Sequence, residues 1–257
     1  MVDPQSVFIT GASSGIGAAL ARHYALQGAN VGLFARRGAA LEALVATLPA
    51  GHAAAYAGDV RDAGALARAA ADFIARFGAP DVVIANAGVS RGALTEYAED
   101  LPAFRAVIDT NVVGMVHTFQ PFLVAMRLAG RGALVGIASV AGFRGLPGSG
   151  AYSASKAAAI TYLESLRLEQ RGTGVAVLTI CPGYIATPMT EENPYPMPFL
   201  LGADKAARLI GHAIDRRKRF YVLPWPMALI GCLLRWLPRP VYDLAFARAP
   251  RKPRQAA

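Results

Sequence analysis

Short apolar runs that alternate with alanine-rich stretches limit most strongly how this chain can fold. A run that is apolar throughout indicates a strand buried on both faces, and alternation with helices indicates βαβ units in a parallel sheet. The predicted strands are Val7–Thr10, Val31–Ala35, Ala53–Ala57, Val82–Ala85, Ala133–Ala138 and Val175–Ile180. The sequence therefore predicts an α/β fold with a doubly wound parallel sheet, in which the two longest helices span about 102–129 and 151–171.

The length of 257 residues suits one large α/β domain, and no linker divides the chain. We expect the main domain over residues 1–223, followed by a helical C-terminal extension over residues 224–257. Hydrophobic residues make up 54% of the chain and charged residues 17%, which is a globular composition.

The net charge of +9 is confined to the C-terminal part of the chain. Basic and acidic residues balance over residues 1–215, whereas residues 216–257 hold ten basic residues and one acid, Asp243. This division is not that of a nucleic-acid-binding domain, so we predict no nucleic-acid partner. The basic tail either attaches the protein electrostatically to a partner or only increases its solubility.

Cysteine usage argues against a metal site or a disulfide framework. The two cysteines, Cys181 and Cys232, form no CxxC pair and stand in no cluster with histidines. The first residues, MVDPQSVFITG, lack a basic segment followed by an apolar stretch. We therefore expect no metal, no signal peptide and a cytoplasmic location.

A glycine-rich segment, TGASSGIG (Thr10–Gly17), follows the first predicted strand and leads into a helix. Glycines at this point permit a tight turn and a close approach of the backbone to a pyrophosphate, whose charge the helix N-terminus favours. The segment predicts dinucleotide binding.

The end of the second predicted strand favours NADP(H) over NAD(H). An acid usually stands there to bind the ribose 2′-hydroxyl of NAD. This chain instead has Ala35, followed by Arg36 and Arg37. Their guanidinium groups would attract a 2′-phosphate, although either arginine could also be a solvated loop residue.

Three residues form a candidate catalytic group. Tyr152 and Lys156 are four positions apart at the start of a predicted helix, so they lie on the same face. A neighbouring ammonium favours the ionised form of a tyrosine, whose ordinary pKa is about 10. Ser139 follows the strand Ala133–Ala138, where its hydroxyl can hydrogen-bond a reacting oxygen.

The order of these motifs resembles the classical branch of the short-chain dehydrogenase/reductase family over residues 6–223. The motifs are TGASSGIG, Asp59, the NAG of Asn86–Gly88, Asn111, Ser139, the YSASK of Tyr152–Lys156, and Pro182–Gly183 followed by Thr187. The chain departs from the family at Ala85, where NNAG has become ANAG. The resemblance implies a Rossmann fold.

The resemblance also implies roles for these residues. The position of Tyr152 is the general acid/base, that of Lys156 binds the nicotinamide ribose and lowers the pKa of the tyrosine, and that of Ser139 orients the carbonyl. Asn111 would hold a water in a proton relay. Asp59 would contact the adenine, and Thr187 the nicotinamide carboxamide. The expected cofactor-binding residues are Gly11, Ser13, Ser14, Gly15, Ile16, Gly17, Arg36, Arg37, Asp59, Val60, Asn86, Ala87, Gly88, Tyr152, Lys156, Pro182, Gly183, Ile185 and Thr187.

Two segments are candidates for the substrate side. Phe143 and Leu146 lie in the loop before Tyr152, and a proline-rich lid is expected over residues 188–203, within the main domain. With Ser139, Tyr152 and Met189 they would bind a hydrophobic or aromatic substrate. Tyr195, Met197, Phe199 and Leu200 would complete the apolar inner surface of the lid, or would only pack it onto the body.

The apolar run YVLPWPMALIGCLL (221–234) is flanked by arginines. It is too short to cross a bilayer, which takes roughly 20 residues. Peripheral contact with an anionic membrane surface remains open, as does packing against the substrate pocket or a partner subunit.

The sequence thus predicts an NADP(H)-dependent oxidoreductase that interconverts a carbonyl and a secondary or primary alcohol. A catalytically silent NADP(H)-binding sensor or scaffold is the alternative, and an epimerase of the extended branch is disfavoured by chain length and glycine spacing. The resemblance implies a homodimer or homotetramer.

Overall fold

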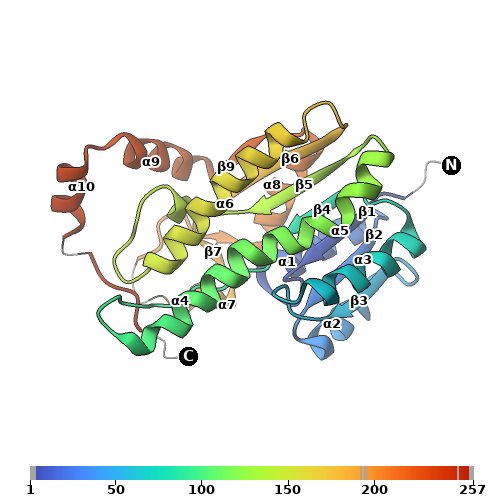
Figure 1. Cartoon of the computed structure of the whole chain (residues 1–257), viewed down its shortest axis with the longest axis horizontal. Coiled ribbons are helices and arrows are strands. Elements are labelled where there is room, and N and C mark those ends of the chain that lie inside the picture. Colours follow the sequence, from blue (N-terminus) through green and yellow to red (C-terminus); the bar gives the residue numbers. More distant parts are fainter. Residues whose placement is uncertain (1–3, 192, 194–195, 248, 255–257) are drawn as a thin grey trace.

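A computed structural model describes residues 4–191, 193, 196–247 and 249–254 (Figure 1). Its main element is a seven-stranded parallel sheet in the order β3-β2-β1-β4-β5-β6-β9. The strands are β1 (Ser6–Thr10), β2 (Asn30–Ala35), β3 (Ala53–Ala57), β4 (Val82–Ala85), β5 (Gly132–Ile137), β6 (Val175–Pro182) and β9 (Phe220–Leu223). In register, Val7 of β1 pairs with Val31 of β2 and Val82 of β4. The predicted doubly wound parallel sheet is confirmed.

Helices cover both faces of the sheet. One core cluster joins it to α1 (Gly15–Leu26), α2 (Gly38–Val45) and α8 (Ala203–Asp215). The other joins it to α3 (Ala63–Phe77), α5 (Gly114–Leu128) and α6 (Gly150–Glu169). The helix expected over 102–129 consists of α4 (Leu101–Ile108), a π-helical turn (Asp109–Val113) and α5.

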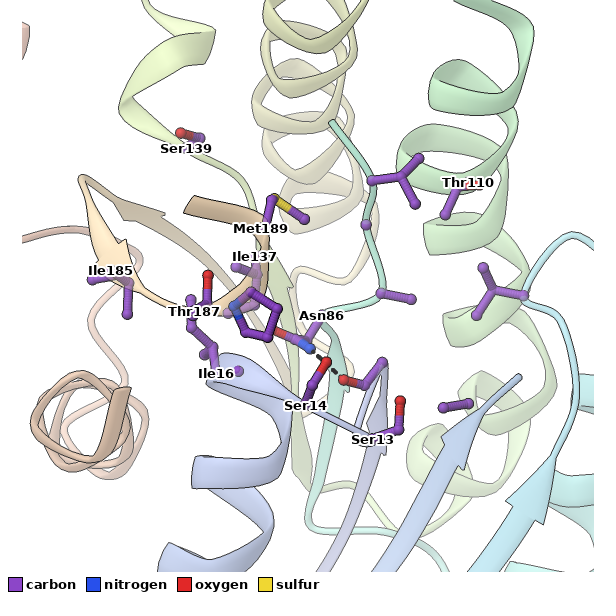
Figure 2. Close-up of a pocket in the computed structure, with 18 of the residues that line it drawn as sticks. Ser13, Ser14, Ile16, Asn86, Thr110, Ile137, Ser139, Ile185, Thr187 and Met189 are labelled. Atoms are coloured by element: carbon purple, nitrogen blue, oxygen red, sulfur yellow. Dashed lines mark hydrogen bonds between the residues drawn. The ribbon is translucent and has the colours of Figure 1, made fainter. Parts of the chain in front are cut away.

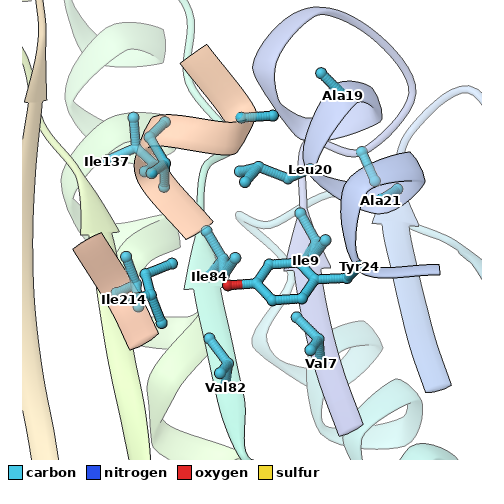
Figure 3. Close-up of a cluster of buried hydrophobic side chains, with 14 of the residues drawn as sticks. Val7, Ile9, Ala19, Leu20, Ala21, Tyr24, Val82, Ile84, Ile137 and Ile214 are labelled. Atoms are coloured by element: carbon cyan, nitrogen blue, oxygen red, sulfur yellow. The ribbon is translucent and has the colours of Figure 1, made fainter. Parts of the chain in front are cut away.

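The buried hydrophobic cluster beneath α1 includes the phenol of Tyr24 (Figure 3). Leu20 and Tyr24, one helical turn apart, pack with Ile9 of β1, Ile84 of β4 and Ile214 of α8. The hydroxyl of Tyr24 is buried and has no hydrogen-bond partner among the described residues. Burial therefore raises the pKa of this phenol.

The structure divides the apolar run 221–234 into a strand and a helix. Its first residues belong to β9, the sheet-edge strand that periodicity did not predict, and α9 (Trp225–Trp236) begins after Pro224. Pro224 and Pro226 stand at the start of α9, where a missing N–H costs no helical hydrogen bond. A further helix, α10 (Arg239–Phe246), follows. None of the helices in the described part of the chain is both long and apolar enough to cross a membrane.

The segment expected to form a lid contains only short elements. These are α7 (Pro188–Glu191) and β8 (Leu201–Gly202), and β8 pairs with β7 (Ile185–Ala186), which directly precedes the lid segment. The predicted lid residue Tyr195 lies outside the described residues, as does Glu192.

The sheet reverses its direction of winding between β1 and β4. In sheets of this kind, ligands bind beyond the carboxyl ends of the strands at such a point. Gly11 follows β1 there, Asn86 follows β4, and β5 leads to Ser139.

Candidate active site

A cleft of about 470 Å³ lies at this edge of the sheet. Figure 2 shows Ser13 and Ser14 of the glycine-rich turn at one end and Ser139 at the other. The cleft brings together the following residues that were expected from the sequence: Gly11, Ser13, Ser14, Gly15, Ile16, Arg36, Arg37, Asp59, Val60, Asn86, Ala87, Gly88, Ser139, Tyr152, Lys156, Pro182, Gly183, Ile185, Thr187 and Met189.

Four expected site residues are not part of the lining. Gly17 and Asn111 lie behind it and support it, as described below. Phe143 and Leu146 lie outside it, and the ring of Phe143 is 6.1 Å from that of Phe220. The lining also contains residues that the motifs did not single out: Ala35, Gly58, Val89, Thr110, Ile137, Ala138, Pro188 and Thr190. Each stands within two positions of an expected residue in the chain, so adjacency to a motif residue was the signal that could have found them.

The glycine-rich turn is too closely packed for side chains. Gly11 has a φ of 68°, and a Cβ there would lie 2.7 Å from the Cα of Ala87. A Cβ on Gly17 would collide with the carbonyl oxygen of Gly11. The amide of Asn86 donates to the carbonyl oxygens of Thr10 and Gly11, at 3.0 and 3.2 Å, and fixes the turn. The glycines thus leave room for a pyrophosphate to approach the backbone at the start of α1.

The end of β2 presents positive charge to the cleft. Ala35 is buried, and the exposed side chains of Arg36 and Arg37 follow it. Arg37 donates from Nη2 to the hydroxyl and the carbonyl oxygen of Ser13, at 3.1 and 3.2 Å, so it lies against the glycine-rich turn. These residues fit a phosphate near the ribose of a dinucleotide.

The nearby carboxylate of Asp59 is already paired. Arg61 donates to it through Nη2 at 2.6 Å and through Nε at 3.0 Å. This pairing lowers the pKa of Asp59 below its usual value, with a smaller contribution from the charge of Arg36.

Lys156 places a buried cation at the other end of the cleft. The residue is 4% exposed, and its Nζ donates to the carbonyl oxygen of Ile137 at 2.8 Å. Burial lowers the pKa of Lys156 to about 8. Its Nζ lies 5.7 Å from the ring centroid of Tyr152, one helical turn before it on α6. Burial raises the pKa of the adjacent Cys181 thiol to about 12.

Ser139 is held by the backbone around it. It precedes a 3₁₀ turn (Val140–Gly142), and its hydroxyl accepts a hydrogen bond from the N–H of Ala141 at 3.1 Å. The hydroxyl is 3.4 Å from the carbonyl oxygen of Pro182, to which it donates. This oxygen is therefore fixed at the carboxyl edge of the sheet and lines the cleft.

Asn111 joins three segments around Lys156. Its Oδ1 accepts from the N–H of Val89 at 2.8 Å, and its Nδ2 donates to the Val89 carbonyl and the Ser155 hydroxyl, both at 2.9 Å. A Cβ on Gly88 would lie 3.2 Å from Oδ1 of Asn111 and 3.6 Å from Nζ of Lys156. The amide and the ammonium therefore flank the same small space. Asn111 lies in the π-helical turn, a distortion that often marks functional sites.

The segment after β6 covers part of the cleft. A Cβ on Gly15 would lie 3.0 Å from the methyl group of Thr187, and Met189 also lines the cleft. In Figure 2, Thr187 lies close to Ile16. Phe199 and Leu200, which were expected on the inner surface of the lid, are about half exposed.

Comparisons with known proteins identify the relatives of this chain. The short chain dehydrogenase family matches residues 5–196. A relative from Myxococcus xanthus (strain DK1622), named an uncharacterized oxidoreductase, is 40% identical over 248 residues, which are 95% of this chain and 97% of the relative.

Two solved structures share the fold. A short chain dehydrogenase/reductase from Burkholderia phymatum, in complex with NAD, has a TM-score of 0.81 and 26% identity and covers 98% of both chains. A short chain dehydrogenase from Burkholderia cenocepacia J2315, in complex with NADP, has a TM-score of 0.82 and 25% identity and covers 97% of this chain and 100% of that one. The chain therefore belongs to the short-chain dehydrogenase/reductase family and is an oxidoreductase.

Proposed function

We propose that the chain is an NADP(H)-dependent oxidoreductase that interconverts a carbonyl and a primary or secondary alcohol. The observation that supports this most is the single cleft in which Ser139, Tyr152 and Lys156 meet the glycine-rich turn. When bound, the nicotinamide supplies or accepts the hydride. The glycine-rich turn, Arg36 and Arg37 would hold its phosphates, and Thr187 and Lys156 its nicotinamide end.

Protein side chains, with Tyr152 as the general acid/base, transfer the proton that accompanies the hydride. In the reduction direction, the phenol of Tyr152 donates a proton to the carbonyl oxygen, and in oxidation the phenolate removes it from the alcohol. Ser139 would turn its hydrogen bond from the carbonyl oxygen of Pro182 to the same substrate oxygen and steady its changing charge. Lys156 is mainly protonated at pH 7, because its pKa of about 8 is above neutrality, and its charge favours the phenolate. Asn111 would order a water that links Lys156 to solvent.

Tyr152→Phe tests this mechanism. The substitution removes one oxygen, so we expect NADPH affinity to stay unchanged and kcat to fall by roughly 10²–10⁴-fold. Tyr162→Phe, on the same helix but outside the cleft lining, is the matched control and should retain wild-type turnover. A fully active Tyr152→Phe variant would overturn the assignment.

We propose the preference for NADP(H) because Ala35, Arg36 and Arg37 stand at the end of β2, where an acid would favour NAD(H). A 2′-phosphate near these residues would meet two guanidinium groups and no acid from the strand end. We expect a higher kcat/KM with NADPH than with NADH, and Arg36→Asp should shift the ratio towards NADH. Comparable efficiency of the wild-type protein with both cofactors would contradict the proposal.

The substrate is proposed to be a hydrophobic or aromatic carbonyl or alcohol. Met189 contributes an apolar side chain to the cleft, and the described lining also holds Ile137, Ala138 and Val89. A panel of aldehydes, ketones, steroids, 3-oxoacyl thioesters and secondary alcohols, assayed with both cofactors, tests this. Higher activity on phosphorylated or highly polar carbonyls would contradict it.

A catalytically silent NADP(H)-binding sensor or scaffold is the competing function. The simultaneous presence of Asn111, Ser139, Tyr152 and Lys156 argues against it. NADPH binding, followed by fluorescence, without turnover of any compound in the panel would favour the sensor.

We also propose a cytoplasmic protein in which residues 1–223 form the catalytic domain and residues 224–257 an extension that touches a membrane. On α9, an outward stripe carries Trp225, Leu229, Leu233 and Trp236, which are 64% to 81% exposed. Arg235 on α9 and Arg239 at the start of α10 are also exposed and could face an anionic lipid surface. Leu229→Glu/Leu233→Glu should abolish co-sedimentation with anionic liposomes. If the wild-type protein does not co-sediment, the stripe is not a membrane contact.

A homodimer or homotetramer is proposed as the assembly, formed through the outer faces of α4, α5 and α6. Phe104 and Val124 are exposed on these helices. Phe104→Glu/Val124→Glu should yield monomers in light scattering if this face is the interface, and an unchanged mass would exclude it.

A further inference from the structure

The C-terminal extension runs along the loop that leads to Tyr152 (residues 141–150). Arg144 of this loop donates to the carbonyl oxygen of Leu237 at 3.3 Å, and its guanidinium lies 4.2 Å from the ring centroid of Tyr242 on α10. The hydroxyl of Tyr242 donates to the carbonyl oxygen of Gly145 at 2.6 Å. The extension therefore supports the outer side of this loop.

Beyond α10 the chain returns to the body (Figure 1), where it contacts a second loop, the one that follows β4. We call residues 251–254 the C-terminal strap. The ammonium of Lys252 donates to the carbonyl oxygen and the hydroxyl of Ser90, at 3.1 and 2.8 Å, and Lys252 is only 7% exposed. Ser90 directly follows Val89, which lines the cleft and holds Asn111. The strap is thus bound one residue away from the cleft wall.

An ion pair fixes the end of the strap. Arg254 donates through Nε and Nη2 to the two oxygens of Asp100, at 2.9 and 3.0 Å, and through Nη2 to Glu99 at 2.9 Å. Its guanidinium stacks 3.5 Å from the ring centroid of Tyr97. Asp100 is 2% exposed and also accepts from the N–H of Leu94 at 2.9 Å. One buried carboxylate therefore holds both the strap and the loop after β4.

Two glycines on the body make room for the strap. Gly92 forms a parallel bridge with Arg254, and a Cβ on Gly92 would collide with the carbonyl oxygen of Pro253. A Cβ on Gly148 would lie 2.7 Å from the backbone nitrogen of Lys252. The neighbouring residue Ala93 bridges Ser149, so the strap and the two loops form one continuous layer.

We propose that the C-terminal strap determines substrate selection by holding the loop 89–94 and the loop 141–150 together at the substrate side of the cleft. This rests on the proposed function, because both loops adjoin residues assigned to catalysis: one leads to Tyr152, and the other contains Val89, whose backbone holds the amide of Asn111. Arg254 is a positioning residue that acts through Asp100. The glycine-rich turn lies at the opposite end of the cleft from Ser139 (Figure 2), so we expect the strap variants to keep wild-type affinity for NADPH.

The test compares Gly92→Ala, which displaces the strap by a steric clash, with Arg254→Gln, which removes its ion pair. Gly150→Ala is the matched control, because a Cβ there meets nothing within 4 Å. We expect both strap variants to raise KM for the best carbonyl on the order of tenfold, since small displacements of positioning loops are costly. Their kcat, their NADPH Kd and the values for Gly150→Ala should stay within about threefold of wild type. The ratio of kcat/KM for bulky over small carbonyls should rise in both.

Hydrogen exchange of the same proteins separates this inference from the proposed function. Faster exchange confined to residues 89–94 and 141–150 in both strap variants is expected, whether or not a substrate has been found. A wild-type protein without turnover would refute the proposed function, and the exchange data would then decide whether the strap holds the loops. Unchanged KM and unchanged exchange in both strap variants would overturn the inference.

Discussion

The buried ammonium of Lys156 should make the stability of this protein depend on pH in a distinctive way. Burial lowers the pKa of Lys156 from 10.5 to about 8 in the folded chain. In the unfolded chain the side chain is solvated and keeps its ordinary pKa. Between these two values the unfolded state binds more protons than the folded state, so stability rises with pH.

The magnitude follows from the difference between the two pKa values. Each pKa unit corresponds to about 1.4 kcal/mol, so the charge on Lys156 costs the folded state about 3 kcal/mol at neutral pH. That cost is fully present below pH 8 and disappears by about pH 10.5, as the folded protein loses its proton first. Lys156→Met lacks this titration but keeps an apolar stem of similar length.

The assay is urea unfolding of wild type and Lys156→Met at several pH values from 7.5 to 10.5. Other groups titrate in both proteins, so the difference between the two free energies of unfolding isolates Lys156. We expect wild type to gain about 3 kcal/mol relative to the variant over this range. Parallel pH profiles would refute the reasoning, because they would mean that burial leaves the pKa of Lys156 unshifted.

Three further predictions concern residues around the sheet. Tyr24→Phe removes a buried hydroxyl that lacks a partner among the described residues, so the free energy of unfolding should rise by about 1 kcal/mol in urea titrations. A decrease of that size would mean that the Tyr24 hydroxyl makes a stabilising hydrogen bond. Gly17→Ala places a methyl group against the carbonyl oxygen of Gly11, and isothermal titration should show NADPH affinity reduced at least ~10-fold, whereas wild-type affinity would contradict a tightly packed phosphate turn. Asn111→Ala leaves the N–H and carbonyl of Val89 without their side-chain partner, so the free energy of unfolding should fall by about 2 kcal/mol in urea titrations and kcat should fall as well. Wild-type stability would show that these hydrogen bonds contribute little.

Local sequence information was sufficient for the elements that lead into the site. The apolar runs at Val7–Thr10 and Val82–Ala85 form β1 and β4, because a strand buried on both faces must be apolar throughout. The spacing of Tyr152 and Lys156 placed both on one face of α6, because four residues span about one helical turn. Features that depend on the spacing of residues within a short stretch could therefore be predicted from the sequence.

Features that depend on contacts between residues far apart in the sequence could not be predicted in this way. The strand β9 is short and is followed at once by α9, so the apolar residues of both elements form one run in the sequence. Only the pairing of β9 with β6 in the structure shows that the first part of this run is a strand. Phe143 reads as a substrate contact from its position before Tyr152, yet in three dimensions it packs beside Gly231 of α9.

The sequence by itself determined the α/β class, the family and the positions of the candidate catalytic residues, because each depends on periodicity or on motifs within a short stretch. Only the tertiary structure decided that Asn111 supports the cleft from behind, that Lys156 is buried enough to lose part of its basicity, and that Arg254 pairs with Asp100. Burial and ion pairing arise between residues far apart in the chain, and their energies depend on distances that no local pattern encodes.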